Sequence, residues 1–257
     1  ELKIPSGIQS GQVLRMKGKG FPRLRSKSNG DQLVKIQEQP PGKYSRKTKK
    51  IIEKKLQKRL NDNSIFFDDN RRLSGAKQLQ KDRIKLISEQ YKSQDFLKHI
   101  NIEPHLVIYS EKINSAKDNY QLLSAEGEFT RKIYGILSRE FDFDDFKRNH
   151  GKKDSQDLVN SYLDYGNYLA YGMGASTLYA LGISYAFPLN HGKTRRGALV
   201  FDIADVIKDA VIMPIAFYSA YTGEADNEFR KRCVANIYKS KASDKMFSSI
   251  KNICENI

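Results

Sequence analysis

The chain has few residues that could cross-link it, since only two cysteines, Cys233 and Cys254, occur among 257 residues. They stand in no metal-binding or redox spacing and suggest no disulfide framework. This argues against a disulfide-rich secreted protein and against a zinc module. We expect a cytoplasmic protein with two reduced, buried thiols.

Long apolar runs and nucleotide-binding motifs are also absent. The longest apolar stretches, 168–187 and 210–220, are interrupted by Gly, Ser and Pro, which indicates core helices rather than bilayer-spanning ones. No signal-peptide pattern opens the sequence. It contains no Gly-x-Gly-x-x-Gly motif, no Walker loop and no spacing that supports a serine or cysteine nucleophile triad. We therefore expect no membrane partner.

Positive charge is abundant but unevenly distributed. The chain carries 45 Lys and Arg against 30 Asp and Glu, a net charge of +15. Residues 1–60 alone hold 17 Lys and Arg against 4 Asp and Glu, whereas residues 61–257 hold 28 against 26. A basic segment attracts polyanions without sequence preference, although a solvated basic surface is the alternative interpretation. The high charge therefore describes the first segment only.

The pattern predicts a mainly α protein, in which a small β-rich segment with one helix (1–60) precedes an all-helical domain (65–257). Leu2–Ile4 and Leu33–Ile36 are short β-prone runs separated by glycine-rich turns. Apolar residues then recur every three to four positions over 45–60, which predicts an amphipathic helix. The polar run 61–64 is the expected boundary.

Helical periodicity dominates the rest of the chain. We expect helices over 71–99, 119–141, 155–182, 202–222, 226–240 and 242–255. Asp226 and Ser243 are the expected N-caps of the last two, because their side chains can accept from free backbone N–H groups. A charged loop is expected from Asp142 to Lys153.

A carboxylate lies among the apolar positions of the predicted helix 119–141. Glu126 falls close to the stripe formed by Leu122, Phe129 and Ile133. Because an unpaired buried carboxylate is costly, it must bind a metal or a cation. A salt bridge to Arg131 or another cation is the simpler interpretation of this pattern.

A second group of ionisable residues occurs between 191 and 208. His191 follows a Pro-Leu-Asn turn, and Asp202 and Asp205 are three residues apart, so their carboxylates point to one side of a helix. For Asp202 an N-cap or first-turn role is the competing interpretation. For Asp205 it is neutralisation by Lys208.

Together, Glu126, His191 and Asp205 are a ligand set that suits Mg²⁺ or Mn²⁺ with open water positions. Such an ion polarises a phosphodiester and offsets charge on the leaving oxygen. Three neighbouring cations can hold DNA phosphates, with a plain surface cluster as the alternative: Lys193, Arg195 and Arg196. The spacing by itself leaves this site possible.

The same stretches resemble a known family. LDYGNYLAYGMGASTLYALGI and HGKTRRGALVFDIADVIKDAVIMPIAFYSA closely resemble the CRISPR-associated integrase that acquires spacers, in its type I-F form, and the match runs from about Ile65 to the C-terminus. AEGEFTRKIY resembles the family's first ligand motif, a glutamate followed eight residues later by a tyrosine, here Glu126 and Tyr134. His191 and Asp205 match the second and third metal ligands, and Asp202 a nearby acidic position.

This resemblance implies a metal-dependent DNA endonuclease and integrase. The 3′-hydroxyl of a captured double-stranded fragment would attack a phosphodiester at the edge of a CRISPR repeat, with Glu126, His191, Asp205 and Asp202 as site residues. Family members act as homodimers. They are bridged by a second small acquisition protein, which in this subtype is fused to the interference helicase-nuclease. The β-sheet domain that opens the family is not found in this sequence.

Residues 1–58 instead resemble the end of a DnaJ-type co-chaperone. LKIPSGIQSGQVLRMKGKGFPRLRSKSNGDQLVKI resembles strands of its peptide-binding subdomain, and PPGKYSRKTKKIIEKKL its closing helix. The J domain and the zinc module have no counterpart here. Two other functions thus stay open, a DNA-binding subunit without turnover and a chaperone-like peptide-binding module joined to a helical scaffold.

Overall fold

The computed structural model describes residues 13–22, 28–35, 68–149, 157–186, 188–191 and 197–256. It divides into two compact units, Glu1–Lys54 and Lys55–Ile257. The mainly helical fold predicted from the sequence is confirmed, with strands only in the first unit among the described residues. The predicted strand Leu2–Ile4 and the predicted helix over 45–60 lie outside the described residues.

The first unit contains an antiparallel hairpin. Strand β1 (Val13–Met16) pairs with β2 (Gln32–Lys35), with Val13 opposite Lys35 and Met16 opposite Gln32. Strand β2 corresponds to most of the predicted run Leu33–Ile36. Strand β1 was missed, because its four residues lie among the glycines that indicated turns.

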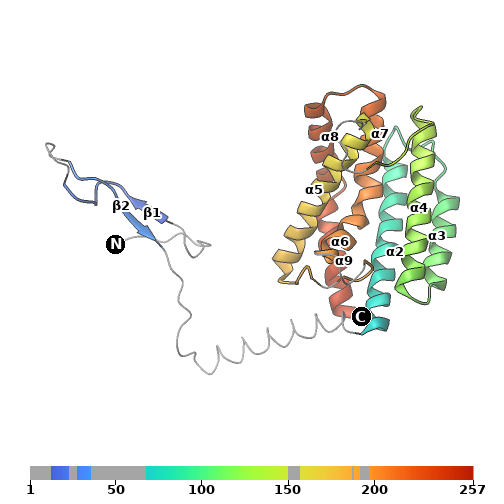
Figure 1. The fold of residues 1–257 in the computed structure, drawn as a ribbon, viewed down its shortest axis with the longest axis horizontal. Coiled ribbons are helices and arrows are strands. Elements are labelled where there is room, and N and C mark those ends of the chain that lie inside the picture. The colour runs from blue at the N-terminus through green and yellow to red at the C-terminus, as the bar shows by residue number, and fades with distance from the viewer. Residues whose placement is uncertain are drawn as a thin grey trace. The chain divides into compact units, whose positions relative to one another are not determined.

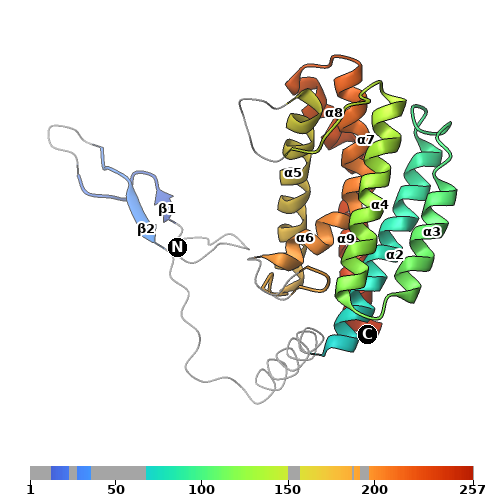
Figure 2. The ribbon, with the colours of Figure 1, turned by 45° about the vertical axis from the view of Figure 1, so that its right-hand side comes forward.

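The second unit is a helical bundle (Figures 1 and 2). Its elements follow in chain order: α2 (Asp69–Ser93), α3 (Glu103–Ser115), α4 (Asn119–Glu140), α5 (Leu158–Leu181), α6 (Ala198–Ile207), the π-helical turn η2 (Lys208–Ile212), α7 (Met213–Tyr221), α8 (Asp226–Lys239) and α9 (Ala242–Asn256). Within the described residues, no helix combines the length and apolar character that crossing a bilayer requires.

The segment α6–η2–α7 is the centre of this bundle. It packs between α2 and α5, while α4 lies against α2, α3 and α7 (Figures 1 and 2). Nearly every residue from Asp202 to Phe217 is buried. Because neighbours enclose the segment on several sides, the polar groups that it carries must find partners inside the protein.

Aspartates begin three of the helices. The carboxylates of Asp68, Asp118 and Asp157 accept backbone N–H groups in the first turns of α2, α4 and α5. These caps satisfy donors that have no partner within the helix. They fix where α2 and α4 begin, and these two helices contribute side chains to the site described below.

Several predicted helix ends were wrong. The predicted helix 71–99 ends at Ser93, and a separate helix, α3, follows it. The sequence did carry a signal for α3, since Pro104 is favoured in a first turn and Leu106, Tyr109 and Ile113 share one face. The predicted N-caps were also misplaced, because α8 begins at Asp226 itself and Ser243 lies within α9.

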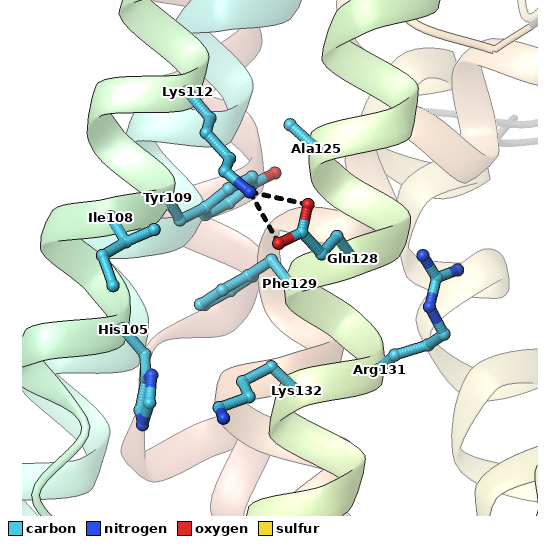
Figure 3. A pocket seen from close by; sticks show the side chains of 9 residues that line it. All are labelled: His105, Ile108, Tyr109, Lys112, Ala125, Glu128, Phe129, Arg131 and Lys132. Atoms are coloured by element: carbon cyan, nitrogen blue, oxygen red, sulfur yellow. Dashed lines mark hydrogen bonds and ion pairs between the residues drawn. The ribbon is translucent and has the colours of Figure 1, made fainter.

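The antiparallel helices α3 and α4 border a groove of about 490 Å³ (Figure 3). Tyr109 of α3 and Phe129 of α4 stack across it, with ring centroids 4.1 Å apart and ring planes 8° apart. The hydroxyl of Tyr109 donates to Oε1 of Gln80 on α2 at 2.6 Å. The floor of the groove is therefore fixed to α2.

The π-helical turn packs tightly against α5. A Cβ atom added to Gly166 would lie 2.2 Å from Cγ2 of Ile212, whereas one added to Gly172, on the same helix, would meet nothing within 4 Å. Ile212 is fully buried, so it has little room to move. Gly166 therefore sets the distance between α5 and the centre of the bundle.

We expect Gly166→Ala to destabilise the protein by about 1–3 kcal/mol, because the added methyl group overpacks the contact with Ile212. Gly172→Ala is the matched control, and its better helix propensity should stabilise the protein by up to about 1 kcal/mol. Urea unfolding followed by circular dichroism measures both effects. Equal stability of the two variants would contradict the close packing described here.

Candidate metal and nucleic-acid site

Glu126 of α4 is largely buried, with 12% of its side chain exposed, and both of its oxygens have partners. Oε1 accepts from Nη1 of Arg83 at 2.9 Å. Oε2 accepts from Nε2 of Gln80 at 3.1 Å and from Nδ2 of Asn190 at 2.7 Å. Its cationic partner is therefore Arg83 of α2, and not Arg131 of its own helix.

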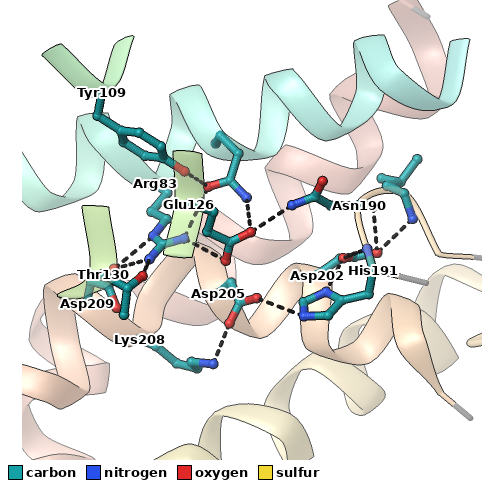
Figure 4. A network of polar contacts seen from close by, with 12 residues as sticks. Arg83, Tyr109, Glu126, Thr130, Asn190, His191, Asp202, Asp205, Lys208 and Asp209 are labelled. Carbon is teal, nitrogen blue, oxygen red and sulfur yellow. Dashed lines mark hydrogen bonds and ion pairs between the residues drawn. The ribbon is translucent and has the colours of Figure 1, made fainter. Parts of the chain in front are cut away.

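Arg83 connects three helical segments through its guanidinium group (Figure 4). Besides Glu126, it bonds Asp209 of η2 through Nε at 2.9 Å and also through Nη2. Nη2 donates to Oγ1 of Thr130 on α4 at 2.8 Å. The guanidinium thus holds two carboxylates on opposite sides, with 3% of the Arg83 side chain exposed.

The prediction of the site missed Arg83 and Gln80. Both lie on the buried face of α2, in the same stripe as Ala76, Leu79 and Leu86. A polar residue at an apolar position of an amphipathic helix was the available signal, because such a group needs a buried partner. The sequence could not indicate which carboxylate it would meet.

Asp202 does not cap its helix, which corrects one competing interpretation. Helix α6 begins at Ala198 after Gly197, so Asp202 lies in its second turn. Its carboxylate accepts the backbone N–H groups of three consecutive loop residues, Leu189 at 2.7 Å, Asn190 at 3.2 Å and His191 at 3.0 Å. Asp202 therefore fixes the loop that carries His191.

The same carboxylate orients the imidazole of His191. Oδ1 of Asp202 lies 2.6 Å from Nδ1, and Nε2 on the other side of the ring lies 3.9 Å from Oδ2 of Asp205. When the ring is neutral, a proton on Nδ1 donated to Asp202 leaves the lone pair on Nε2, which faces Asp205. Although burial lowers the pKa of His191, the bond to Asp202 and the charge of Asp205 outweigh it and raise the pKa.

Asp205 pairs with Lys208, as the competing interpretation proposed. Its Oδ1 contacts Nζ of Lys208, three residues later at the start of η2. Burial would raise the pKa of Asp205, but the charges of Lys208 and Arg83 outweigh this effect and lower it. Asp205 is therefore held as a carboxylate in the interior.

Glu126 behaves differently from Asp205. Burial, together with the negative charge of Asp205, raises the pKa of Glu126 to about 7, although Arg83 opposes the shift. Two nearby carboxylates share the cations of this network, so the second negative charge is disfavoured. An additional cation close to both carboxylates would relieve this repulsion.

The structure brings Glu126, His191, Asp202 and Asp205 into one network, from α4, α6 and the segment 188–191 (Figure 4). Within the described residues, no three His, Cys, Asp or Glu side chains already form a metal-binding group. Arg83 and Lys208 instead neutralise the carboxylates. The predicted phosphate-binding residues Lys193, Arg195 and Arg196 lie outside the described residues.

Comparison with known proteins identifies the family. Residues 39–251 match the family model of the CRISPR associated protein Cas1, and the chain belongs to this family. A CRISPR-associated endonuclease Cas1 from Pectobacterium atrosepticum is 35% identical over 201 residues, which cover 76% of this chain and 61% of that protein. Its counterpart from Pseudomonas aeruginosa is 32% identical over 199 residues, with coverage of 74% and 61%. The chain therefore matches about three fifths of the length of these relatives.

Solved structures show the same fold. A CAS1 protein from Thermotoga maritima superposes with a TM-score of 0.63 at 16% identity, covering 76% of this chain and 68% of that one. A casposase bound to an integration product gives 0.60 at 15% identity, with coverage of 79% and 66%. The helical bundle is therefore a Cas1-like fold.

The first segment has separate relatives. Residues 1–41 match the family model of the DnaJ C terminal domain. The chaperone protein DnaJ of Leptospira biflexa is 49% identical over 53 residues, which cover 21% of this chain and 14% of that protein. The resemblances to the Cas1 family and to DnaJ are thus confirmed, whereas the type I-F form stays a prediction. The DnaJ match is confined to a short part of the chaperone.

We expect Arg83→Met to destabilise the fold by about 3–5 kcal/mol, because Glu126 and Asp209 lose their buried cation. Lys112→Met is the control, since it removes only the exposed ion pair with Glu128 and should cost at most about 1 kcal/mol. Urea unfolding at neutral pH measures both. Similar costs for the two variants would show that the Arg83 network contributes no more than a surface pair.

We expect Asp202→Asn to lower the pKa of His191 in the metal-free protein, because the hydrogen-bonded carboxylate that raises it is lost. A raised pKa in the folded state stabilises the protein below the ordinary histidine pKa, and this stabilisation disappears as pH rises through the folded-state value. The variant should therefore lose more stability at pH 6 than at pH 8.5. Imidazole chemical shifts in an NMR titration measure the pKa directly, with Asp244→Asn on α9 as the control.

Proposed function

We propose that this chain is a divalent-metal-dependent DNA endonuclease and integrase of CRISPR adaptation, of the type I-F form. The observation that supports this proposal is one polar network in a chain of the Cas1 family, in which Glu126 bonds Asn190 and the next residue, His191, faces Asp205. Glu126 comes from α4, His191 from the segment 188–191 and Asp205 from α6. The curated relatives are named endonucleases, and one structural relative is a casposase bound to an integration product.

The residues present fit a hard divalent cation. Two carboxylates and one imidazole are donors that suit Mg²⁺ or Mn²⁺. Oδ1 of Asn190 is buried beside this network and finds no hydrogen-bond donor in the part of the chain that the structure describes. Glu126, His191 and Asp205 would hold the ion. When bound, it would polarise the scissile phosphodiester and offset the charge on the leaving oxygen.

The chain's own residues prepare this site. Asp202 fixes the imidazole so that the lone pair on Nε2 of His191 faces Asp205. Arg83 and Lys208 balance the two carboxylates, so the buried charges are compensated without an ion. We propose that the ion pairs of Arg83 with Glu126 and of Lys208 with Asp205 weaken when the metal ion binds.

The proposed substrate is double-stranded DNA. The 3′-hydroxyl of a captured fragment attacks a phosphodiester at the edge of a CRISPR repeat. A new phosphorus–oxygen bond forms and the repeat's own 3′-oxygen leaves, so one phosphodiester replaces another and no covalent enzyme nucleophile is needed. Lys193, Arg195 and Arg196 are the proposed phosphate-binding residues.

The proposed assembly is a cytoplasmic homodimer, bridged by the small acquisition protein that is fused to the interference helicase-nuclease. A DNA-binding subunit without turnover is the second candidate function. It is favoured by the pairing of both carboxylates with protein cations. A chaperone function has less support, because the DnaJ match covers 21% of this chain whereas the Cas1 match covers 76%.

We expect Glu126→Ala to abolish Mn²⁺-dependent cutting of labelled duplex DNA and to weaken Mn²⁺ binding at least about tenfold, because one carboxylate ligand is lost. Glu128→Ala is the control, since Glu128 is on the same helix but is exposed and paired with Lys112. Gel assays and calorimetry measure cutting and binding. Cutting that survives Glu126→Ala would exclude this site, while DNA binding without cutting by the unaltered chain would favour the second candidate.

A further inference from the structure

The groove between α3 and α4 has no part in the proposed reaction. Its floor is apolar, formed mainly by Tyr109, Ala125 and Phe129 (Figure 3). Its volume of about 490 Å³ is typical of a pocket that binds a ligand or an inserted side chain. The fixed ring of Tyr109, whose hydroxyl is bound to Gln80, gives the floor a defined shape before anything binds.

Apolar surface continues beyond the floor along α3. Ile108 borders the groove and is 51% exposed. Its exposed side chain thus extends the apolar surface to the rim of the cavity. This arrangement fits a peptide segment better than a compact small molecule, since a peptide covers the groove and its rim together.

Positive charge surrounds this apolar surface. The lining residues include Lys112, Arg131 and Lys132, but only one carboxylate, Glu128. Burial and the charge of Lys132 lower the pKa of His105, which lies at the same end of the groove. The groove therefore has excess positive charge at its edges, which complements an acidic occupant.

The ion pair across the groove is exposed and weak. Nζ of Lys112 lies 2.6 Å from each carboxylate oxygen of Glu128, and the two side chains are 40% and 61% exposed. Such pairs contribute about 0–1 kcal/mol. An incoming carboxylate can therefore take Lys112 from Glu128 at little cost.

We propose that the groove between α3 and α4 binds an acidic peptide segment of a partner protein. An apolar side chain of the segment packs on Tyr109, Phe129 and Ile108. Carboxylates on either side of it pair with Lys132 at one end and with Lys112 at the other. Duplex DNA matches this surface less well, because phosphates leave the apolar floor and rim exposed to water.

A peptide-binding experiment without metal tests this proposal on the full chain. The probe is a fluorescein-labelled decapeptide with a central Leu-Phe pair flanked by glutamates, and binding is followed by fluorescence polarisation. We expect binding that weakens about tenfold or more in Lys132→Glu and in Ile108→Asp, which remove the charge and the apolar contact separately. Lys251→Glu, on α9, is the matched control and should bind like the unaltered chain.

Three results would overturn the proposal. The first is no binding by the unaltered chain, and the second is equal binding of a peptide whose glutamates are replaced by glutamines. The third is displacement of the peptide by a short DNA duplex that protects the amides of α3 and α4 in hydrogen exchange, which would assign the groove to nucleic acid. Circular dichroism confirms that the variants fold, as expected for substitutions at exposed positions. Because metal and DNA cutting are not involved, this test is independent of the proposed nuclease site.

Discussion

The guanidinium of Arg83 lies in the bundle interior and bonds carboxylates from two other segments, Glu126 of α4 and Asp209 of η2. Without a cation between them, these carboxylates would be buried with uncompensated charge, which proteins avoid. The ion pairs of Arg83 with Glu126 and Asp209 therefore determine how α2, α4 and η2 pack together. Because Glu126 and Asp205 belong to the same electrostatic network, this constraint also sets the geometry of the candidate site.

Two kinds of contact hold the site around this centre. Asp202 fixes the loop and the imidazole of His191 through hydrogen bonds to consecutive N–H groups and to Nδ1. Gln80 links Glu126 to Tyr109, which is also the floor of the groove between α3 and α4. The carboxylate of the site and the floor of the groove thus share one hydrogen-bonded chain, and α2 supports both.

The fold class was predictable because helix periodicity is local. Apolar residues at intervals of three to four positions located α4, α5 and the region of α6–α7. Helix ends were predicted less well, because capping depends on which backbone groups lack other partners. Asp226 illustrates this, because it is the first residue of α8 and Ala225 occupies the cap position. The backbone N–H of Ala225 donates to the side chain of Glu228.

The sequence by itself determined the residue types at the site, Glu126, His191, Asp202 and Asp205, and the resemblance that assigned them a common role. Only the tertiary structure decided their partners. The cation bound to Glu126 is 43 residues away in Arg83 rather than five residues away in Arg131, and Asp202 holds a loop instead of capping its helix. The physical reason is that an amphipathic pattern indicates which face is buried but not which face lies opposite it, and a buried charge is satisfied by whatever that opposite face provides.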